Sequence, residues 1–252
     1  MPTTLPRALQ HPLLWQGNRR QERIPALPTG HERLDRALPG GGWPLGALTE
    51  LLVPRDGVGE LSLLLPTLAR VTREGGWAVL LDPPWTPYPP ALHGQGIDLE
   101  RLVLVSTRDA QASLWACEQA LRGVRGGVVL SWLRGRRHRA GFAHLRRLQL
   151  AARSGRKGAF LFRGPDAAGQ ATPASLRLHL EAGERDLRLT LLKCRGTHQG
   201  VRVRLPLTHG APGAPSSRPS VAPSATRASS AASTGAASRP GGHSDPPAAG
   251  RA

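Results

Sequence analysis

The chain has 252 residues, of which 39% are hydrophobic, and this is enough for one domain with a sizeable core and extensions. No apolar run approaches the roughly 20 residues of a transmembrane helix, and the first residues lack the apolar stretch of a secretion signal. Two cysteines, Cys117 and Cys194, exclude a disulfide framework and show no metal-binding spacing. We therefore expect a cytoplasmic protein with no membrane contact, no metal and no cofactor.

The formal net charge of +17, from 34 basic and 17 acidic residues, is a strong compositional signal. Such a charge favours a polyanionic partner, above all nucleic acid. However, only Lys157 and Lys193 are lysines, and an arginine excess beside many alanines, glycines and prolines is also typical of a GC-rich coding bias. Direct DNA binding and coding bias are therefore two open interpretations of the charge.

Residues 1–23 precede the first predicted element, and we define them as the N-terminal arm. The arm contains a small apolar cluster whose candidate partner-binding residues are Leu13, Leu14 and Trp15. One interpretation is a segment that packs on its own domain. The other is an arm that binds a second protein or a second copy of the chain.

Residues 49–70 predict a strand, a glycine-containing loop and a helix. Residues 49–53 are short and apolar, as in a buried parallel strand, and residues 60–70 place leucines at helical spacing. This order is typical of a phosphate-binding loop, in which backbone N–H groups and a helix N-terminus meet the phosphates.

The loop itself departs from the pattern G-x-x-x-x-G-K-[ST] that phosphate binding needs. Aligned on Gly59, the first glycine is Pro54, the lysine is Glu60 and the hydroxyl residue is Leu61, while Gly57 lies between. A carboxylate replaces the ammonium group, and it would repel a phosphate by about 4 kcal/mol at an effective dielectric constant of ~20. We expect the shape of a phosphate loop without nucleotide binding.

The rest of the chain up to residue 207 alternates between predicted strands and helices. A segment that starts helical at residue 92 ends at Gly94. Apolar runs predict strands at residues 77–82, 102–105, 127–133 and 159–162. Helical spacing predicts helices at residues 109–121 and 142–153. Period-two alternation predicts strands of a mixed or antiparallel edge at residues 176–180, 187–193 and 201–205. The pattern favours an α/β domain with a mostly parallel central sheet flanked by helices.

A run of basic residues follows the strand predicted at residues 127–133. The candidate DNA-binding residues in it are Arg134, Arg136, Arg137 and Arg139. They lie at the carboxyl end of a strand, where α/β folds bind ligands, and could neutralise several phosphates. The alternative is a solvated charged loop, and only Trp132 and Phe142 flank it for base stacking.

Two further segments are predicted to be irregular. Residues 163–175 are rich in Gly, Ala and Pro and predict a mobile loop. Residues 208–252 consist mainly of Ala, Pro, Ser and Gly, cannot bury a core, and predict a disordered tail. The domain organisation is therefore an arm (1–23), a core (24–207) and a tail (208–252).

Residues 27–65 resemble the RecA recombinase family. Beyond the glycine loop, an ordered series falls at that family's spacing: Thr29-Gly30, Leu34-Asp35, Ala37-Leu38, Gly41-Gly42, Pro44, Gly46 and Glu50. Residues 9–207 are covered by the resemblance, which implies a single RecA-like domain. Gly57 to Leu61 and the N-terminal HPLLW are most similar to the ImuA group within the degenerate branch that also holds SulA.

The resemblance also indicates which family positions have changed. The catalytic glutamate of active members corresponds to Pro84, and the strand-end aspartate that organises the metal corresponds to Ser131. Lys193 and Arg195 resemble the basic pair that recombinases offer to a neighbour's nucleotide, and here they become candidates for a protein contact. Because Glu60, Pro84 and Ser131 stand where active members have the loop lysine, the catalytic glutamate and the metal-organising aspartate, we expect no ATPase activity.

The resemblance to ImuA implies an accessory protein of SOS-induced, error-prone translesion DNA synthesis. The implied partners are an ImuB-like Y-family protein, an error-prone paralogue of the polymerase III α-subunit, and RecA, with association to the nucleoid when active. The main alternative is a SulA-like cell-division inhibitor that binds FtsZ. A diverged ATPase and a plain DNA-binding module are the two others.

Overall fold

The computed structural model describes residues 25–123, 126–134, 140–194 and 200–206. The apolar cluster at residues 13–15, the basic residues at 136, 137 and 139, Arg195 and the tail lie outside these ranges. Within the described residues, no helix is both long enough and apolar enough to cross a membrane.

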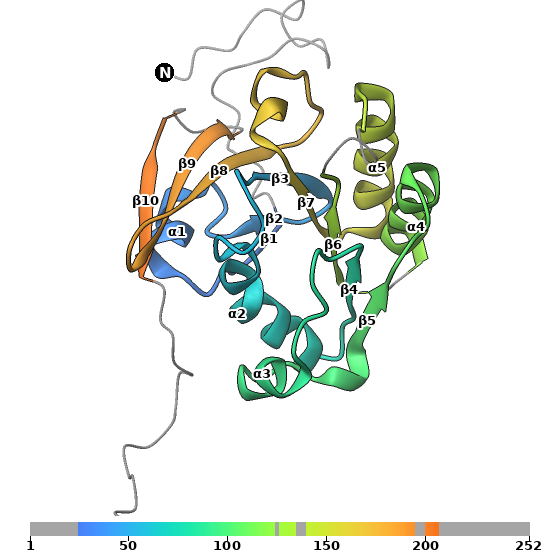
Figure 1. Cartoon of the computed structure of the whole chain (residues 1–252), viewed down its shortest axis with the longest axis horizontal. Helices are drawn as coiled ribbons and strands as arrows, with labels where there is room; N and C mark the ends of the chain where they lie inside the picture. The colour runs from blue at the N-terminus through green and yellow to red at the C-terminus, as the bar shows by residue number, and fades with distance from the viewer. Residues whose placement is uncertain (1–24, 124–125, 135–139, 195–199, 207–252) are drawn as a thin grey trace, which may run out of the picture. The chain divides into compact units, whose positions relative to one another are not determined.

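An eight-stranded sheet with the order β10-β9-β8-β3-β7-β6-β4-β5 forms the centre of the domain (Figure 1). The strands from β8 to β5 in this order pair in parallel, whereas β8, β9 and β10 pair antiparallel. The strands are β3 (Ala47–Leu52), β4 (Ala78–Leu81), β5 (Leu102–Val105), β6 (Val128–Trp132), β7 (Gly158–Arg163), β8 (Leu176–Ala182), β9 (Asp186–Cys194) and β10 (Arg202–Pro206). The predicted α/β class, with a mostly parallel sheet and an antiparallel edge, is confirmed.

Five helices and two short 3-10 turns connect these strands in the described residues. They are α1 (Glu32–Ala37), α2 (Glu60–Arg73), α3 (Pro89–Gly94), η2 (Leu99–Arg101), α4 (Ala110–Gly123), α5 (Phe142–Gly155) and η4 (Pro165–Gly169). The expected helices at 60–70, 109–121 and 142–153 are confirmed, and α3 ends at Gly94 as expected. The short α1 and the two-stranded pair β1 (Ala26–Leu27) and β2 (Trp43–Pro44) were not predicted, because elements of two to six residues leave no readable period.

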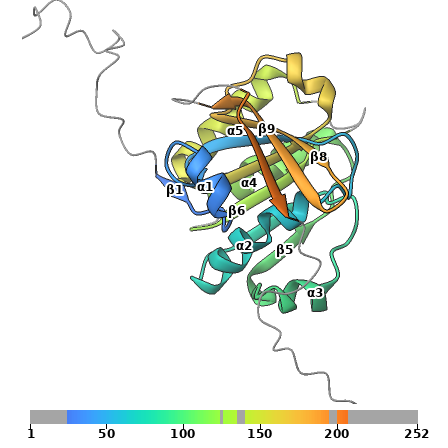
Figure 2. The ribbon, with the colours of Figure 1, turned by 90° about the vertical axis from the view of Figure 1, so that its left-hand side faces the viewer.

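The two faces of the sheet bury separate apolar clusters. Leu51 of β3 shares one cluster with Leu64 of α2, while Leu48 shares the other with Cys117 of α4 and Leu148 of α5. Strands β3, β6 and β7 are buried along their whole length because helices cover both of their faces. Figures 1 and 2 show α4 and α5 together on one face of the sheet, away from α2.

Trp43 joins α2 to the sheet. Its indole N–H donates to the hydroxyl of Thr67 at 3.0 Å, and its ring meets Phe160 of β7 edge-on with centroids 5.3 Å apart. A buried Trp needs a partner for its N–H, and the Thr67 hydroxyl provides one in the middle of α2. This packing fixes the helix whose N-terminus follows the glycine loop.

Candidate functional site

The parallel strands direct their carboxyl ends to one edge of the sheet, where α/β folds place ligands. The described segments that follow the strands at this edge are residues 53–59 after β3, 82–88 after β4, 106–109 after β5, 133–134 after β6 and 164–175 after β7. The glycine loop after β3 and Arg134 at the start of the basic run after β6 both lie at this edge.

The glycine loop lies between β3 and α2, and it is held by its own side chains. Gly57 and Gly59 adopt positive φ angles of 78° and 98°, which glycine tolerates without strain. The Gly57 N–H donates to Glu60 Oε1 at 3.0 Å. Glu60 is 4% exposed, and among the described residues its second oxygen has no hydrogen-bond partner. The carboxylate thus lies inside the turn, against a backbone N–H.

Arg134 connects this loop to the basic run. Its guanidinium forms an ion pair with Asp56 of the glycine loop. Arg134 is therefore engaged within the chain, whereas Arg136, Arg137 and Arg139 lie outside the described residues. The ion pair therefore places the first residue of the basic run beside the glycine loop.

A buried charged cluster, which we call the Glu50 cluster, lies behind these loops. Glu50 in the middle of β3 is fully buried and accepts from Arg163 of β7 at 2.8 Å and from Arg177 of β8 at 2.7 Å. Arg163 also donates to the carbonyl of Ala140, at the far end of the basic run, and to the side chain of Gln170. This cluster was not predicted from the sequence. Charged residues inside apolar strands could have indicated it, because buried charges need partners.

The comparisons with known proteins agree with this geometry. The family described as RecA N-terminal domain matches residues 10–128. "Protein RecA" of Prochlorococcus marinus (strain MIT 9303) is 31% identical over 114 residues, which are 45% of this chain and 30% of that protein. "Protein RecA" of Bacillus subtilis (strain 168) is 29% identical over 114 residues, which are 45% of this chain and 32% of that protein.

The protein contains a RecA-like domain. The matched region spans about a third of the length of these RecA proteins. Because this is well under two thirds of their length, the activity and partners of this chain are left to be proposed.

The residues of the RecA-like glycine loop do not fit a nucleotide phosphate. The Glu60 carboxylate already accepts from the Gly57 N–H, which a phosphate oxygen would otherwise use. Leu61, in the first turn of α2, presents an apolar side chain that packs against the core. A second anion beside the buried carboxylate would be repelled.

Two other positions that the resemblance singled out are also placed in the structure. Pro84 follows β4, and Asp82 before it binds Thr107 through both oxygens, one to its N–H at 2.6 Å and one to its hydroxyl at 2.8 Å. Ser131 is buried within β6. The Asp82 carboxylate therefore joins the end of β4 to the loop after β5.

The loop at residues 163–175 differs from the prediction of a mobile segment. Part of it forms η4, and Arg177 donates to the carbonyls of Ala168 and Gln170 at 2.9 and 3.0 Å. Lys193 of β9, a candidate partner-binding residue, donates to the carbonyl of Thr172 at 2.7 Å. Glycine and alanine content predicted mobility, but buried guanidinium groups from distant strands hold the backbone.

Three titratable groups are shifted by burial. Burial lowers the pKa of Lys157 to about 8, although its ammonium donates to the carbonyls of Ala120 and Leu121 at the end of α4. Burial raises the pKa of the Cys117 thiol to about 12, which makes a reactive thiolate unavailable at neutral pH. Burial also lowers the pKa of His31, whose ring contacts the Leu63 carbonyl at 3.2 Å.

None of the described residues forms a cluster of three or more His, Cys, Asp or Glu side chains able to hold a metal ion.

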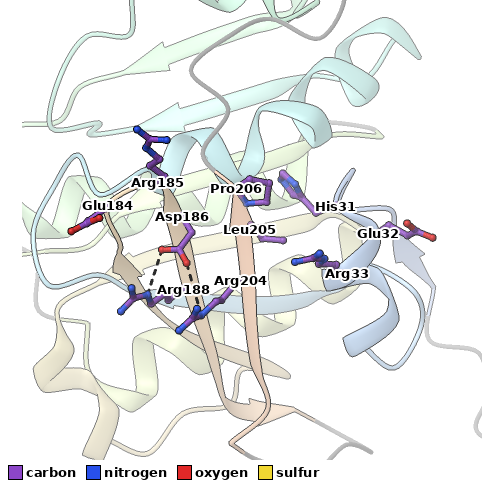
Figure 3. A pocket seen from close by; sticks show the side chains of 10 residues that line it. All are labelled: His31, Glu32, Arg33, Glu184, Arg185, Asp186, Arg188, Arg204, Leu205 and Pro206. Atoms are coloured by element: carbon purple, nitrogen blue, oxygen red, sulfur yellow. Dashed lines mark ion pairs between the residues drawn. The ribbon is translucent and has the colours of Figure 1, made fainter.

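A wide groove of about 810 Å³ lies between α1 and the ends of β9 and β10 (Figure 3). Arg188 and Arg204 both pair with Asp186, at 3.4 and 3.9 Å. Figure 3 also shows Arg33 and Arg185 together with Glu32 and Glu184 around the groove. Because its charges are mixed, the groove selects neither an anionic nor a cationic ligand.

Proposed function

We propose that this protein is a non-catalytic RecA-like accessory protein of SOS-induced, error-prone translesion DNA synthesis. It acts as a scaffold that keeps the surfaces of a RecA-like domain and has lost the nucleotide chemistry. The proposed partners are an ImuB-like Y-family protein, an error-prone paralogue of the polymerase III α-subunit, and RecA. It works in the cytoplasm and associates with the nucleoid when active.

The observation that carries this proposal is the Glu60 carboxylate inside the glycine loop. Its hydrogen bond to the Gly57 N–H, together with its burial, supports a loop that is complete without a ligand. Family members that use ATP need a cation there to stabilise phosphate charge. A carboxylate at the same place opposes that chemistry, and this supports a scaffold over an ATPase.

The internal bonds of the domain support a second part of the proposal, which is that its surfaces do not depend on nucleotide. Arg134 is held by Asp56 at the start of the basic run, and the Ala140 carbonyl is held by Arg163 at its end. The Glu50 cluster also holds the loop at residues 164–170. The glycine loop and the loop at residues 164–170 are held by protein groups, so these two loops need no bound ligand to be ordered.

A pull-down from DNA-damaged cells tests the proposal. The baits are the full chain and residues 1–208, with undamaged cells as the control. We expect both baits to recover RecA and translesion polymerases. Recovery of the division protein FtsZ without these partners would contradict the proposal and support the SulA-like alternative.

Equilibrium dialysis with ATP tests the loss of nucleotide chemistry separately. We expect no saturable ATP binding by the full chain and no phosphate release. Saturable binding to the full chain would contradict a non-catalytic scaffold. Its loss in a Gly59→Val variant that circular dichroism shows to be folded would assign the binding to the glycine loop, and this control is needed because Gly59 has a positive φ that valine does not tolerate.

A further inference from the structure

The described part of the central sheet ends in two edge strands, β10 and β5, whose outer sides differ in chemistry (Figure 1). β10 carries Arg202 and Arg204 on its exposed face and ends at Pro206, which has no N–H to donate. Charged side chains and proline protect a sheet edge from pairing with another chain. β5 reads Leu-Val-Leu-Val and therefore lacks this protection.

The apolar side chains of β5 are exposed at its edge of the sheet. Val103 is 37% exposed and Leu104 is 45% exposed, although successive residues of a strand lie on opposite faces. Parallel strands of an α/β sheet are normally covered on both faces, as β3, β6 and β7 are. Among the described residues, β5 is thus covered less completely than the central strands.

The backbone of β5 directs hydrogen-bonding groups to its outer side. The Val105 carbonyl accepts from the Asp82 N–H, at the end of β4, at 2.8 Å. In a parallel pair, every second residue of a strand directs both its N–H and its carbonyl to the neighbour, so those of Val103 and Val105 face β4. The backbone groups of Leu102 and Leu104 therefore point outward, where the described residues provide no further strand.

These outward groups are complementary to those of a second β5 that runs antiparallel. If Val103 lies opposite the Val103 of the other copy, Leu102 of each copy lies opposite Leu104 of the other. Leu102 and Leu104 then exchange both of their hydrogen bonds, and the two Val103 residues form the non-hydrogen-bonded pair between them. A two-fold axis at Val103 thus satisfies the outward backbone groups of both strands.

The charge distribution at this edge favours a second copy over a polyanion. Two copies of a chain with a net charge of +17 repel each other. However, the sequence between Arg73 and Arg101 contains no Lys or Arg, and Arg101 itself pairs with Asp98 at 3.7 Å. Antiparallel pairing also directs Arg108, after β5, toward the exposed Glu100 before the other β5, so that opposite charges meet at both ends.

We propose that two copies of this protein form a two-fold symmetric dimer by antiparallel pairing of their β5 strands. The two central sheets become one continuous sheet, with Val103 at the axis. Leu104 of each copy packs beside Leu102 of the other, which removes apolar surface from water. Because the same strand of both copies is used, the assembly closes at two copies and does not extend into a chain.

This inference does not depend on the proposed scaffold function. A protein that forms the β5 dimer could still recover none of the proposed partners in the pull-down. Conversely, a monomeric protein could recover all of them. The two proposals can therefore fail separately.

Sedimentation velocity of the full chain over a range of micromolar concentrations tests the inference. We expect the wild type to show a monomer–dimer equilibrium without larger species. Val103→Lys should raise the dissociation constant of the dimer by more than about ten-fold, because two ammonium groups would meet at the axis. The matched control is Leu150→Lys, which should keep the dimer, since Leu150 is 54% exposed on α5 and lies outside β5. Circular dichroism melting shows whether each variant is folded.

A mixture of two charge variants tests the two-fold register. Val103→Lys and Val103→Glu should each be mostly monomeric, whereas an equimolar mixture should form dimers because opposite charges then meet at the axis. A head-to-tail contact would give no such recovery, because residue 103 would not face its counterpart.

Cross-linking keeps the test available if the charged variants do not fold, because cysteine is close to valine in size. The Cα atoms of a non-hydrogen-bonded pair lie about 4.5 Å apart, within the range of a disulfide. Oxidised glutathione should therefore link two copies of Val103→Cys into a covalent dimer. The control is the wild type, which contains only Cys117 and Cys194.

Four results would overturn the inference. The wild type could remain monomeric at every concentration, which would indicate that another segment, such as the N-terminal arm, covers the edge. The dimer could survive in folded Val103→Lys, or the mixture of charge variants could remain monomeric. Val103→Cys could also give no more covalent dimer than the wild type.

Discussion

Glu50 and Glu60 are two buried carboxylates on either side of the glycine loop, and their surroundings differ. Glu50 lies inside β3 with a guanidinium on each oxygen. Glu60 begins α2 with one oxygen on the Gly57 N–H and the other without a partner among the described residues. A fully paired buried charge stabilises a fold through its contacts, whereas a half-paired one costs desolvation that its contacts offset only in part.

The difference indicates which carboxylate the fold depends on. Glu50 holds Arg163 and Arg177, and these arginines hold the loops at residues 140 and 164–170. Glu60 holds only the turn of which it is a part. We therefore interpret Glu50 as a structural centre of the domain and Glu60 as a local substitute for a ligand.

Glu50→Gln should have the largest effect on stability. It keeps the shape of the side chain but leaves Arg163 and Arg177 without a counter-charge, and breaking a buried pair costs about 3–5 kcal/mol. Urea unfolding followed by circular dichroism measures this loss. The matched control is Glu74→Gln, whose pair with Arg70 is exposed and should contribute less than about 1 kcal/mol. Equal losses in the two variants would contradict the structural role of Glu50.

Lys157 extends the comparison to a buried cation that has no carboxylate partner among the described residues. Lys157→Met should cost about 1–3 kcal/mol, because the carbonyls of Ala120 and Leu121 lose their donor. The wild type should also gain stability relative to this variant as the pH rises from about 8 to 10.5. Between these values the unfolded lysine holds its proton while the folded one has lost it, so the unfolding free energy rises with pH.

Unfolding of the wild type and of Lys157→Met at several pH values tests whether the difference in their unfolding free energies rises with pH. The rise should be about 3 kcal/mol at most, from 1.36 kcal/mol for each pKa unit. A wild type that loses stability relative to Lys157→Met across this interval would show that hydrogen bonds to the carbonyls outweigh desolvation. The measurement thereby separates the two opposing effects on the ammonium.

Glu60→Gln should change the unfolding free energy by less than about 1 kcal/mol. The amide oxygen still accepts from the Gly57 N–H, and the charge on the unpartnered oxygen is removed. Glu60→Ala should cost about 0.5–1.5 kcal/mol, the net contribution of one hydrogen bond, because the Gly57 N–H loses its acceptor. A loss with Glu60→Gln as large as that with Glu50→Gln would abolish the distinction between the two carboxylates.

Arg134→Ala should have the smallest effect, below about 1 kcal/mol, because its pair with Asp56 is partly exposed and screened by solvent. A double-mutant cycle with Asp56→Ala measures the coupling between the two residues. Coupling above about 2 kcal/mol would mean that the ion pair, together with Glu60, is part of what holds the glycine loop.

Much of the fold was predictable from local patterns. The apolar runs and helical spacings predicted the eight strands of the main sheet and the helices α2, α4 and α5, because buried parallel strands and amphipathic helices leave a period in the sequence. The glycine loop and its three replaced positions were also readable, since its function depends on residue types at fixed spacing. The short α1 and the β1–β2 pair were not predicted, because elements this short show no periodic pattern of apolar residues.

The aromatic residues show what local patterns could not decide. Trp132 and Phe142 were the stacking candidates beside the basic run, yet Trp132 is 5% exposed and stacks on Phe162 with centroids 4.4 Å apart. Trp115, which drew no attention in the sequence, lies on α4 and lines a groove together with His144 and Arg147 of α5. Only helix packing could place them together.

The sequence by itself determined the fold class and the strand–loop–helix unit, because these depend on neighbours along the chain. That the phosphate-binding residues of the loop are replaced stays a prediction from the same local pattern. Tertiary structure alone decided that Glu50 meets Arg163 and Arg177, more than 100 positions away along the chain, and that the loop after β7 is held in place. It also decided which aromatic ring is exposed. Contacts between distant residues arise from strand order and helix packing, which no local period records.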